Sequence, residues 1–209
     1  MLAWLQRVLL GRRVSPLAAV APGEACLIVG LGNPGPVYAG TRHNLGFECA
    51  DHLAARLGAA WAADDGALVA LTNASRSRLV LAKPQRFMNR SGPVVAGLVT
   101  RLAIEPHSVL IVYDDMDLPF GALRLRARGS AGTHNGMRSV VRALGTEEIA
   151  RLRIGIGQAG PGAATDHVLS RFGPDEALRV AELVERAGDA ALAWAKEGAE
   201  VAMNRYNRS

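Results

Sequence analysis

The sequence predicts an α/β fold in which a largely parallel sheet carries helices on both faces. Two observations predict it. Short apolar runs, typical of buried strands, alternate along the chain with segments in which apolar residues recur at helical spacing. The chain also has 209 residues, with no internal repeat and no long linker, which fits one domain.

The strands are predicted from apolar runs and from one alternating segment. The runs CLIVGL at 26–31 and VLIVY at 109–113 are continuous, as expected for strands buried on both faces. The segment ALRLRAR at 122–128 alternates, which predicts a strand with one solvent-exposed face lined by arginine. Further strands are expected at 68–71 and 78–82, as a pair around 73–75, and at 152–157.

The helical pattern predicts helices over 44–57, 91–102, 134–144 and 175–196. Gly58 and Gly145 end the first and third, because glycine readily takes the left-handed conformation that closes a helix. Pro93 is compatible with the second, since proline is tolerated in a first turn. The fourth follows Pro174 and carries acidic residues early, where they interact favourably with the helix dipole.

The charge of the chain indicates a polyanionic partner. Basic residues number 24 against 19 acidic ones, which gives a net charge of +5. Residues 118–153 concentrate this charge, with seven arginines against Glu147 and Glu148. Arginine binds phosphate through a planar fork of donors, so this block suits a nucleic acid. A genome rich in G and C would also favour arginine codons, so the overall charge alone is a weak indication.

Composition excludes several other classes of protein. No apolar run approaches the roughly 18 residues of a membrane-spanning helix, so no membrane partner is expected. Cys26 and Cys49 are too few for a disulfide scaffold or a cysteine-only zinc site. No pair of histidines has the spacing of a zinc site either. We therefore expect a protein of the reducing cytoplasm.

Residues 1–24 differ from the remainder. They contain three arginines, no acid before Glu24, and Pro16 and Pro22. A targeting peptide is one interpretation, but the apolar stretch is short and broken by Gln6 and Arg7. We expect a flexible, dispensable N-terminal extension over 1–24, or a start codon assigned too early, and a folded domain over 25–209.

Residues 30–35, GLGNPG, match the glycine pattern of dinucleotide-binding folds. In those folds the pattern opens directly into a helix whose N-terminus binds the pyrophosphate. Here Pro34 and Pro36 follow, so no helix begins before about His43. A nucleotide-binding enzyme is therefore a weak alternative.

Polar clusters follow several of the predicted strands. In a parallel sheet such loops meet at one edge, so we expect His43, Asp114 and the amides Asn33, Asn89 and Asn135 to converge. A buried carboxylate fixes the tautomer of a histidine base, and amides bind a carbonyl substrate. No Cys lies in these loops and no serine has the context of a nucleophile, which favours a histidine that acts on water. The alternatives are simple turn chemistry and an acidic Mg²⁺-binding loop.

Four separated motifs carry a family resemblance: IVGLGNPGPVYAGTRHNLGF, KPQRFMNRSGPVV, VYDDMDLPFGALRLRARGSAGTHNGMRS and RLRIGIG. Together with HVLSRF they cover about residues 26–173, and the sequence strongly resembles the bacterial peptidyl-tRNA hydrolase family. The resemblance implies a mixed, mostly parallel sheet in a three-layer sandwich of the phosphorylase/hydrolase type. It implies hydrolysis of the ester between a peptide and the terminal ribose of tRNA, by a monomer without a metal, cofactor or obligate protein partner.

The resemblance also assigns roles to residues. His43 matches the catalytic base, Asp114 the acid that keeps it competent, and Asn33 the residue that separates N-blocked from free aminoacyl esters. Substrate-contacting positions are matched by Tyr38, Phe87, Met88, Asn89 and Asn135, with Met88 on the peptide side. Separately, Arg138 and Arg142 lie four residues apart on one predicted helix, so we expect them to bind neighbouring phosphates. A non-catalytic RNA-binding protein of the same fold, as in plant intron-splicing factors, is the second hypothesis.

Overall fold

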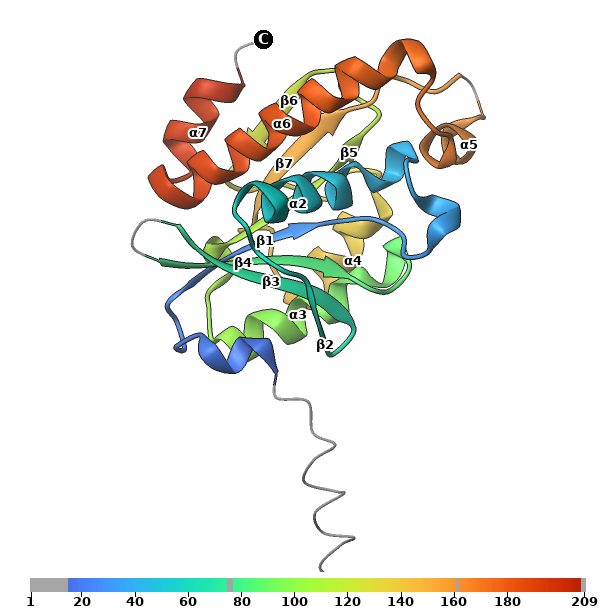
Figure 1. The fold of residues 1–209 in the computed structure, drawn as a ribbon. Helices are drawn as coiled ribbons and strands as arrows, with labels where there is room; N and C mark the ends of the chain where they lie inside the picture. The colour runs from blue at the N-terminus through green and yellow to red at the C-terminus, as the bar shows by residue number, and fades with distance from the viewer. Residues whose placement is uncertain (1–14, 75–76, 161, 208–209) are drawn as a thin grey trace, which may run out of the picture.

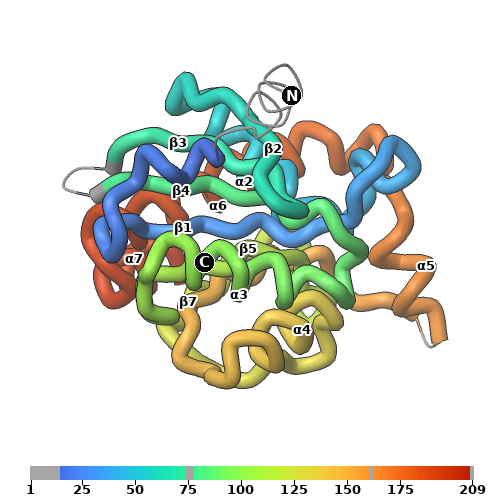
Figure 2. The backbone as a smooth tube through the Cα atoms, turned by 90° about the horizontal axis from the view of Figure 1, so that it is seen from below, coloured from blue at the N-terminus to red at the C-terminus, as the bar shows by residue number. Residues whose placement is uncertain are grey.

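The computed structural model describes residues 15–74, 77–160 and 162–207, and these form a seven-stranded mixed sheet (Figure 1). The strand order is β2-β3-β4-β1-β5-β7-β6, and the central strands lie side by side in this order in Figure 2. The strands are β1 (Ala25–Gly30), β2 (Ala62–Asp64), β3 (Ala67–Ala74), β4 (Ser77–Pro84), β5 (Val109–Asp115), β6 (Leu123–Arg126) and β7 (Ala150–Gly155).

The centre of the sheet is parallel and its two sides are antiparallel. Strand β1 pairs in parallel with β4 and β5, and β5 pairs in parallel with β7. The pairings β2–β3, β3–β4 and β6–β7 are antiparallel. This confirms the mixed α/β sheet, in which three of the six strand pairings are parallel. The apolar pattern had predicted a largely parallel sheet, which overstated the parallel part. The antiparallel strands at the two sides produce short apolar runs that resemble those of parallel strands.

The helices cover both faces of the sheet, so the three-layer arrangement is confirmed (Figures 1 and 2). One face carries α2 (Leu45–Arg56), α6 (Pro174–Glu197) and α7 (Ala199–Tyr206), and the other carries α3 (Ser91–Leu102) and α4 (Asn135–Leu144). The short helix α5 (Ala164–Leu169) lies at one end. The prediction over 91–102 matches α3, and those for α2, α4 and α6 differ by one residue at their ends. Among the described residues, no helix is both long and apolar enough to cross a membrane.

Alternation along the strands divides the core into two apolar clusters. On β1, Ile28 faces the cluster beneath α2 and α6, whereas Leu27 and Val29 face the cluster beneath α3 and α4. All three side chains are fully buried. The continuous apolar runs of the sequence are therefore strands covered on both faces, as predicted.

Two glycines permit the closest contact between helix and sheet. A Cβ atom on Gly30 would lie 2.0 Å from the carbonyl oxygen of Gly46, at the start of α2. A Cβ on Gly46 would lie 2.4 Å from the oxygen of Val112 in β5. Real Cβ atoms do not approach that closely, so only glycine fits at either position. This contact holds the beginning of α2 directly against the carboxyl end of β1 and the middle of β5.

The outer strand β6 is covered by the C-terminal end of the described chain. The amide group of Asn207 accepts a hydrogen bond from the Leu125 N–H at 2.7 Å and donates one to the Leu125 oxygen at 3.0 Å. One side chain therefore satisfies both backbone groups of Leu125 on its outward side.

The segment that precedes β1 corrects the expected flexible extension in part. Residues Pro16–Ala19 form the 3-10 helix η1, and Leu17 and Val20 are buried in the cluster beneath α3. The N–H of Gly23 donates to the Leu102 oxygen at 2.9 Å. The sequence pattern predicted no helix or strand in this segment, yet Leu17 of η1 and the adjacent Val20 are buried against the domain. Residues 1–14 lie outside the described part of the chain.

We expect Leu17→Ala to lower the free energy of unfolding by about 2 kcal/mol, because Leu17 is 5% exposed and its removal leaves a cavity. The matched control is Leu178→Ala, since Leu178 is 80% exposed and should change stability by no more than about 0.5 kcal/mol. Urea denaturation of both variants provides the measurement. Equal stability of the two variants would contradict the packing of η1.

Candidate active site

The predicted polar loops meet at one edge of the sheet. Asp114 lies near the carboxyl end of β5, and His43 lies in the 3-10 helix η3 (Arg42–Asn44) that leads into α2. Asn33 follows β1, and the 3-10 helix η4 (Met88–Arg90) follows β4. The expected meeting of these loops is a direct result of the parallel centre of the sheet.

His43 and Asp114 form the pair expected of a base and its partner. Nδ1 of His43 lies 2.8 Å from Oδ1 and 3.0 Å from Oδ2 of Asp114. Asp114 is only 1% exposed, so its carboxylate has little access to water. Because an ionised carboxylate can only accept, Nδ1 of His43 donates and the other ring nitrogen, Nε2, remains unprotonated in the neutral ring.

A second histidine, His134, completes this arrangement. Its Nε2 lies 3.2 Å from Oδ1 of Asp114, and its Nδ1 accepts a hydrogen bond from the Met137 N–H at 3.1 Å. The Met137 contact leaves the ring proton on Nε2, so His134 also donates to Asp114. The His134 ring lies 5.0 Å from the His43 ring and 4.6 Å from the Tyr113 ring, between centroids.

No role was predicted for His134 from the sequence. The helical pattern predicted it as the first residue of a helix, whereas it is the N-cap of α4 and its side chain accepts a hydrogen bond from a backbone N–H there. The sequence did contain a signal for His134, because this residue lies in a polar loop that is expected at the same edge of the sheet as Asp114. Asn44 also lies in such a loop and was not predicted as a site residue, although it bonds the backbone of Asn33.

The hydrogen bonds decide the charge of Asp114. Burial alone would raise the pKa of its carboxyl group, but hydrogen bonds from His134 and His43 outweigh burial and hold the pKa well below its usual range. Asp114 is therefore a carboxylate at neutral pH and can stabilise a positive charge that forms on His43.

These three residues also approach metal-binding geometry, since one ligand atom from each lies within 4.8 Å of the others. The hydrogen bonds do not fit that use. Nδ1 of His134 is occupied by the Met137 N–H, so a metal ion on Nε2 would require the ring to lose its only proton. The arrangement fits a carboxylate that accepts from two imidazoles.

Asn33 is held by two backbone segments. Its Oδ1 accepts from the Met88 N–H at 2.8 Å, and its own N–H donates to Oδ1 of Asn44 at 2.7 Å. Nδ2 of Asn44 donates back to the Asn33 oxygen at 3.0 Å. Because the Met88 N–H uses the side-chain oxygen of Asn33, the NH₂ group of this amide is left without a hydrogen-bond partner among the described residues.

The other predicted substrate residues take different positions. The rings of Tyr38 and Phe87 meet edge to face with their centroids 6.2 Å apart, and Phe87 is 55% exposed. Asn89 and Asn135 are also exposed. Met88 is instead buried, and a Cβ atom on Gly136 would lie 2.4 Å from its sulfur atom. Met88 thus packs η4 against α4, and its backbone N–H is what holds Asn33.

A pocket of about 590 Å³ joins the histidines to the arginine-rich strands. Its lining includes His43, Asp114, His134 and Asn135 at one side, and Ala164, Thr165 and Val168 from the α5 helix at another. Arg126, Arg128, Arg151 and Arg153 also line it. Asn33, Tyr38, Phe87, Met88, Asn89, Arg138 and Arg142 are not among its lining residues.

The lining arginines have different partners. Arg151 is buried, and its five N–H groups donate to the oxygens of Gly129, Ser130, Glu147 and Ile149. Arg153 pairs with Asp115, and Arg128 lies 3.3 Å from Glu148. Arg126 is exposed on β6. The block predicted as one phosphate-binding face is therefore partly structural, because carbonyl groups occupy Arg151.

The two helical arginines are both exposed on α4. Nε of Arg138 donates to the Gly132 oxygen at 2.9 Å, so this side chain leans toward the loop that precedes His134. The side chains of Arg138 and Arg142 are thus available at the surface beside the pocket, on the helix that His134 caps.

Together, the fold and the site define a hydrolase in which a carboxylate-held histidine lies at the edge of an α/β sandwich, beside a pocket lined with arginine. The family model for peptidyl-tRNA hydrolase matches residues 27–209. The peptidyl-tRNA hydrolase of Chloroflexus aurantiacus is 52% identical over 184 residues, covering 87% of this chain and 98% of its own. That of Mycobacterium tuberculosis is 47% identical over 187 residues, covering 88% and 98%.

Solved structures agree with the sequence comparison. The crystal structure of peptidyl-tRNA hydrolase from Acinetobacter baumannii superposes with a TM-score of 0.83 at 33% identity, covering 91% of this chain and 98% of that one. This chain belongs to the peptidyl-tRNA hydrolase family, and the resemblance seen in its motifs is confirmed.

We expect the acid sensitivity of the fold to depend on Asp114. Its pKa is lowered in the folded state, so its contribution to stability is present above the unfolded pKa of about 3.9 and is lost as the pH falls below that value. Asp114→Asn should therefore show a smaller loss of unfolding free energy than wild type between about pH 5 and pH 2.

Asp117→Asn is the control, because Asp117 is exposed and the change removes the same charge. It should retain the pH dependence of the wild type in urea denaturation at each pH. A wild-type pH dependence in Asp114→Asn would mean that the two histidines do not stabilise its ionised form.

Proposed function

We propose that this chain hydrolyses the ester between a peptide and the terminal ribose of tRNA, with His43 as general base. One observation carries the proposal: His43 is held at Nδ1 by the buried Asp114 and lies in a pocket that continues to arginine-bearing strands. A base for the ester and cations for the tRNA phosphates are thus found in one pocket. Membership of the peptidyl-tRNA hydrolase family supports the choice of substrate.

The reaction follows from the tautomer of His43. Nε2 takes a proton from water as the water oxygen adds to the ester carbonyl carbon. The imidazolium that forms is stabilised by the Asp114 carboxylate. When the ester C–O bond breaks, His43 returns the proton to the ribose oxygen, so the products are a tRNA with a free terminal hydroxyl group and a peptide carboxylic acid, which then loses its proton to solvent.

The amides bind the substrate in this proposal. Asn33 is fixed by Met88 and Asn44, so its NH₂ group is held in one orientation from which it can donate to a peptide carbonyl. A neutral amide matches a peptide better than the strongly hydrated ammonium of a free aminoacyl ester, which gives selectivity for N-blocked esters. Asn89 and Asn135, with the exposed pair Tyr38 and Phe87, provide further contacts to the substrate.

The tRNA lies along the basic side of the pocket. Arg126 is exposed at the pocket lining, and Arg138 and Arg142 are exposed on α4. These three side chains are better placed for phosphates than Arg151, whose donors are all occupied by carbonyl groups. Phosphate contacts of this kind position the tRNA without reading its sequence.

The enzyme acts as a monomer in the cytoplasm, without a metal ion, cofactor, membrane or obligate protein partner. Its catalytic unit spans residues 25–209, with η1 packed onto it. The RNA-binding alternative has no specific support, because a protein that only binds RNA does not need the buried Asp114 between two histidines.

We expect His43→Ala to lower the turnover number by about 10²–10⁴, the usual contribution of a general base. Affinity for tRNA should change by less than about twofold, because phosphate contacts provide most of it. The measurement is release of an N-acetylated amino acid from tRNA, with binding measured separately. His107→Ala, at an exposed histidine in the 3-10 helix η5 (Pro106–Ser108), should keep wild-type turnover. Substantial turnover in His43→Ala would end the assignment of the base.

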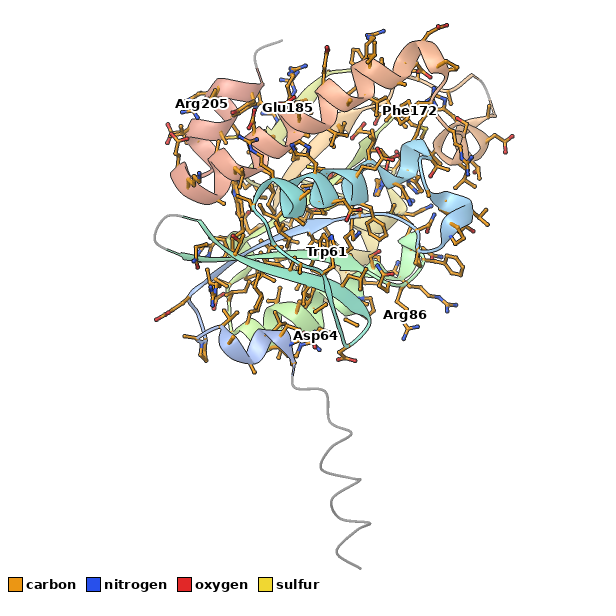
Figure 3. All side chains as sticks on the ribbon, in the orientation of Figure 1. Trp61, Asp64, Arg86, Phe172, Glu185 and Arg205 are labelled. Atoms are coloured by element: carbon orange, nitrogen blue, oxygen red, sulfur yellow. The ribbon has the colours of Figure 1, made fainter. Side chains whose placement is uncertain are left out.

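The affinity for tRNA should fall as the salt concentration rises, and Arg126, Arg138 and Arg142 should each contribute to this dependence. Arg126→Gln should flatten the slope of log K against log salt by about 0.7–0.9 if it removes one phosphate contact, and so should Arg138→Gln and Arg142→Gln. The control is Arg205→Gln, because Arg205 on α7 is paired with Glu197 and is not among the residues that line the pocket (Figure 3). Unchanged slopes in all three variants would place the tRNA on another surface.

A further inference from the structure

Arg42, the residue directly before His43, is attached to a distant part of the chain. The partner is the strap, which we define as residues 170–176, comprising the connection from α5 to α6 and the first residues of α6. The N–H of Arg42 donates to the Ser170 oxygen at 3.0 Å. Thr41 and Arg171 also form an isolated antiparallel bridge. The backbone on the N-terminal side of the base is therefore paired with the strap.

The side chain of Arg42 strengthens this attachment. Its Nη1 donates to the Arg171 oxygen at 2.7 Å, and its Nη2 lies 2.9 Å and 2.8 Å from the two carboxylate oxygens of Glu176. The guanidinium carbon lies 4.4 Å from the centre of the Phe172 ring, in cation–π geometry. Three kinds of interaction with the strap thus converge on one residue next to the base.

Glu176 is itself held in place. Its Oε2 accepts from the Gly173 N–H at 2.8 Å, so the Glu176 side chain holds the N-cap residue of α6 from within the first turn. Arg42 lowers the pKa of this carboxyl group further, after the larger effect of the Gly173 hydrogen bond. Because α6 is a helix of 24 residues packed on the sheet, Arg42 is anchored to a rigid element.

The strap also continues into the wall of the pocket. Helix α5 precedes it, and Thr165 and Val168 of α5 line the same pocket as His43. Figure 1 shows α5 beside the segment that leads into α2, and Figure 3 labels Phe172 in this region. His167 also attaches α5, since its Nε2 lies 3.2 Å and 3.1 Å from the oxygens of Ile156 and Gly157.

We infer that Arg42 is a positioning residue, which fixes the backbone of His43 through the strap and Glu176. This inference rests on the proposed function of His43. Asp114 orients the ring of His43, but η3 is a helix of three residues with no side-chain cap, so other contacts must fix its backbone. The strap provides a backbone acceptor, an ion pair and an aromatic surface. Displacement of a base by about 1 Å can cost about 10² in rate, so this support matters for turnover.

The choice of arginine follows from the contacts. Lysine has no planar fork and cannot reach the Arg171 oxygen and the Glu176 carboxylate while also stacking on Phe172. Arg42→Lys therefore keeps the positive charge but removes the planar set of donors that bonds Arg171 and Glu176 together. Glu176→Gln keeps the size but removes the charge, and since Glu176 is 30% exposed the exchange is compatible with folding.

The test compares Arg42→Lys, Glu176→Gln and the double variant with Asp189→Asn. Asp189 pairs with Arg56 at 2.5 Å, so this control breaks another arginine–carboxylate contact between α2 and α6, away from His43. We expect each single change at the strap to lower kcat about tenfold while KM stays within about twofold. The double variant should be no slower than the slower single variant, because both changes remove one shared contact. Asp189→Asn should keep wild-type kcat.

A second measurement does not depend on activity. Hydrogen exchange of the backbone amide at position 42 should become faster in Arg42→Lys and Glu176→Gln but not in Asp189→Asn, because this N–H donates to the Ser170 oxygen of the strap. In proton NMR, the signal of the His43 Nδ1–H, which is bonded to Asp114, should broaden in the strap variants only.

The outcomes separate the two proposals. Wild-type kcat in folded Arg42→Lys and Glu176→Gln would overturn the positioning role, and so would an equal loss in Asp189→Asn. If the wild type released no peptide from tRNA, the proposed function would fail. The exchange and NMR measurements would still decide whether Arg42 positions His43, since an unchanged Nδ1–H signal in both strap variants would refute it.

Discussion

A buried carboxylate that accepts hydrogen bonds from two imidazoles is the interaction on which the site depends. Asp114 has little access to water at its position in β5, so the hydrogen bonds from His43 and His134 are what stabilise its charge. Each donor comes from a different element, η3 before α2 and the N-cap of α4. The layers on opposite faces of the sheet are therefore linked through one side chain, and the close glycine contact of α2 with β1 and β5 makes this possible.

The sequence predicted the elements that depend on local pattern, and the convergence of His43 and Asp114 followed from the parallel order of strands. What it did not predict depends on contacts between distant residues. Strand β2 has three residues and exists only through its pairing with β3. The burial of Leu17 requires the sheet beneath it, and the role of His134 requires Asp114, which lies 20 residues earlier in the chain. Local periodicity carries no information on such pairs.

The arginines illustrate the limit of composition. Arg151 and Arg153 are two residues apart on β7 and have the same charge, yet Arg151 is surrounded by backbone oxygens and Arg153 pairs with Asp115. A guanidinium group satisfies carbonyl groups as readily as phosphates, because it offers five donors to any planar set of oxygens. A count of positive charge therefore identifies the basic region, whereas the use of each residue depends on the acceptors that the fold brings to it.

The Asn207 contact has a consequence for the behaviour of the protein in solution. Strand β6 is the outer strand of the sheet at one side, and such strands expose unpaired N–H and C=O groups that can recruit a strand from another molecule. By occupying both backbone groups of Leu125, Asn207 takes the place that an incoming strand would use. The end of α7 thus covers this part of the outer strand, and loss of the last few residues of the described chain would leave both backbone groups of Leu125 open to pairing with a strand from another molecule.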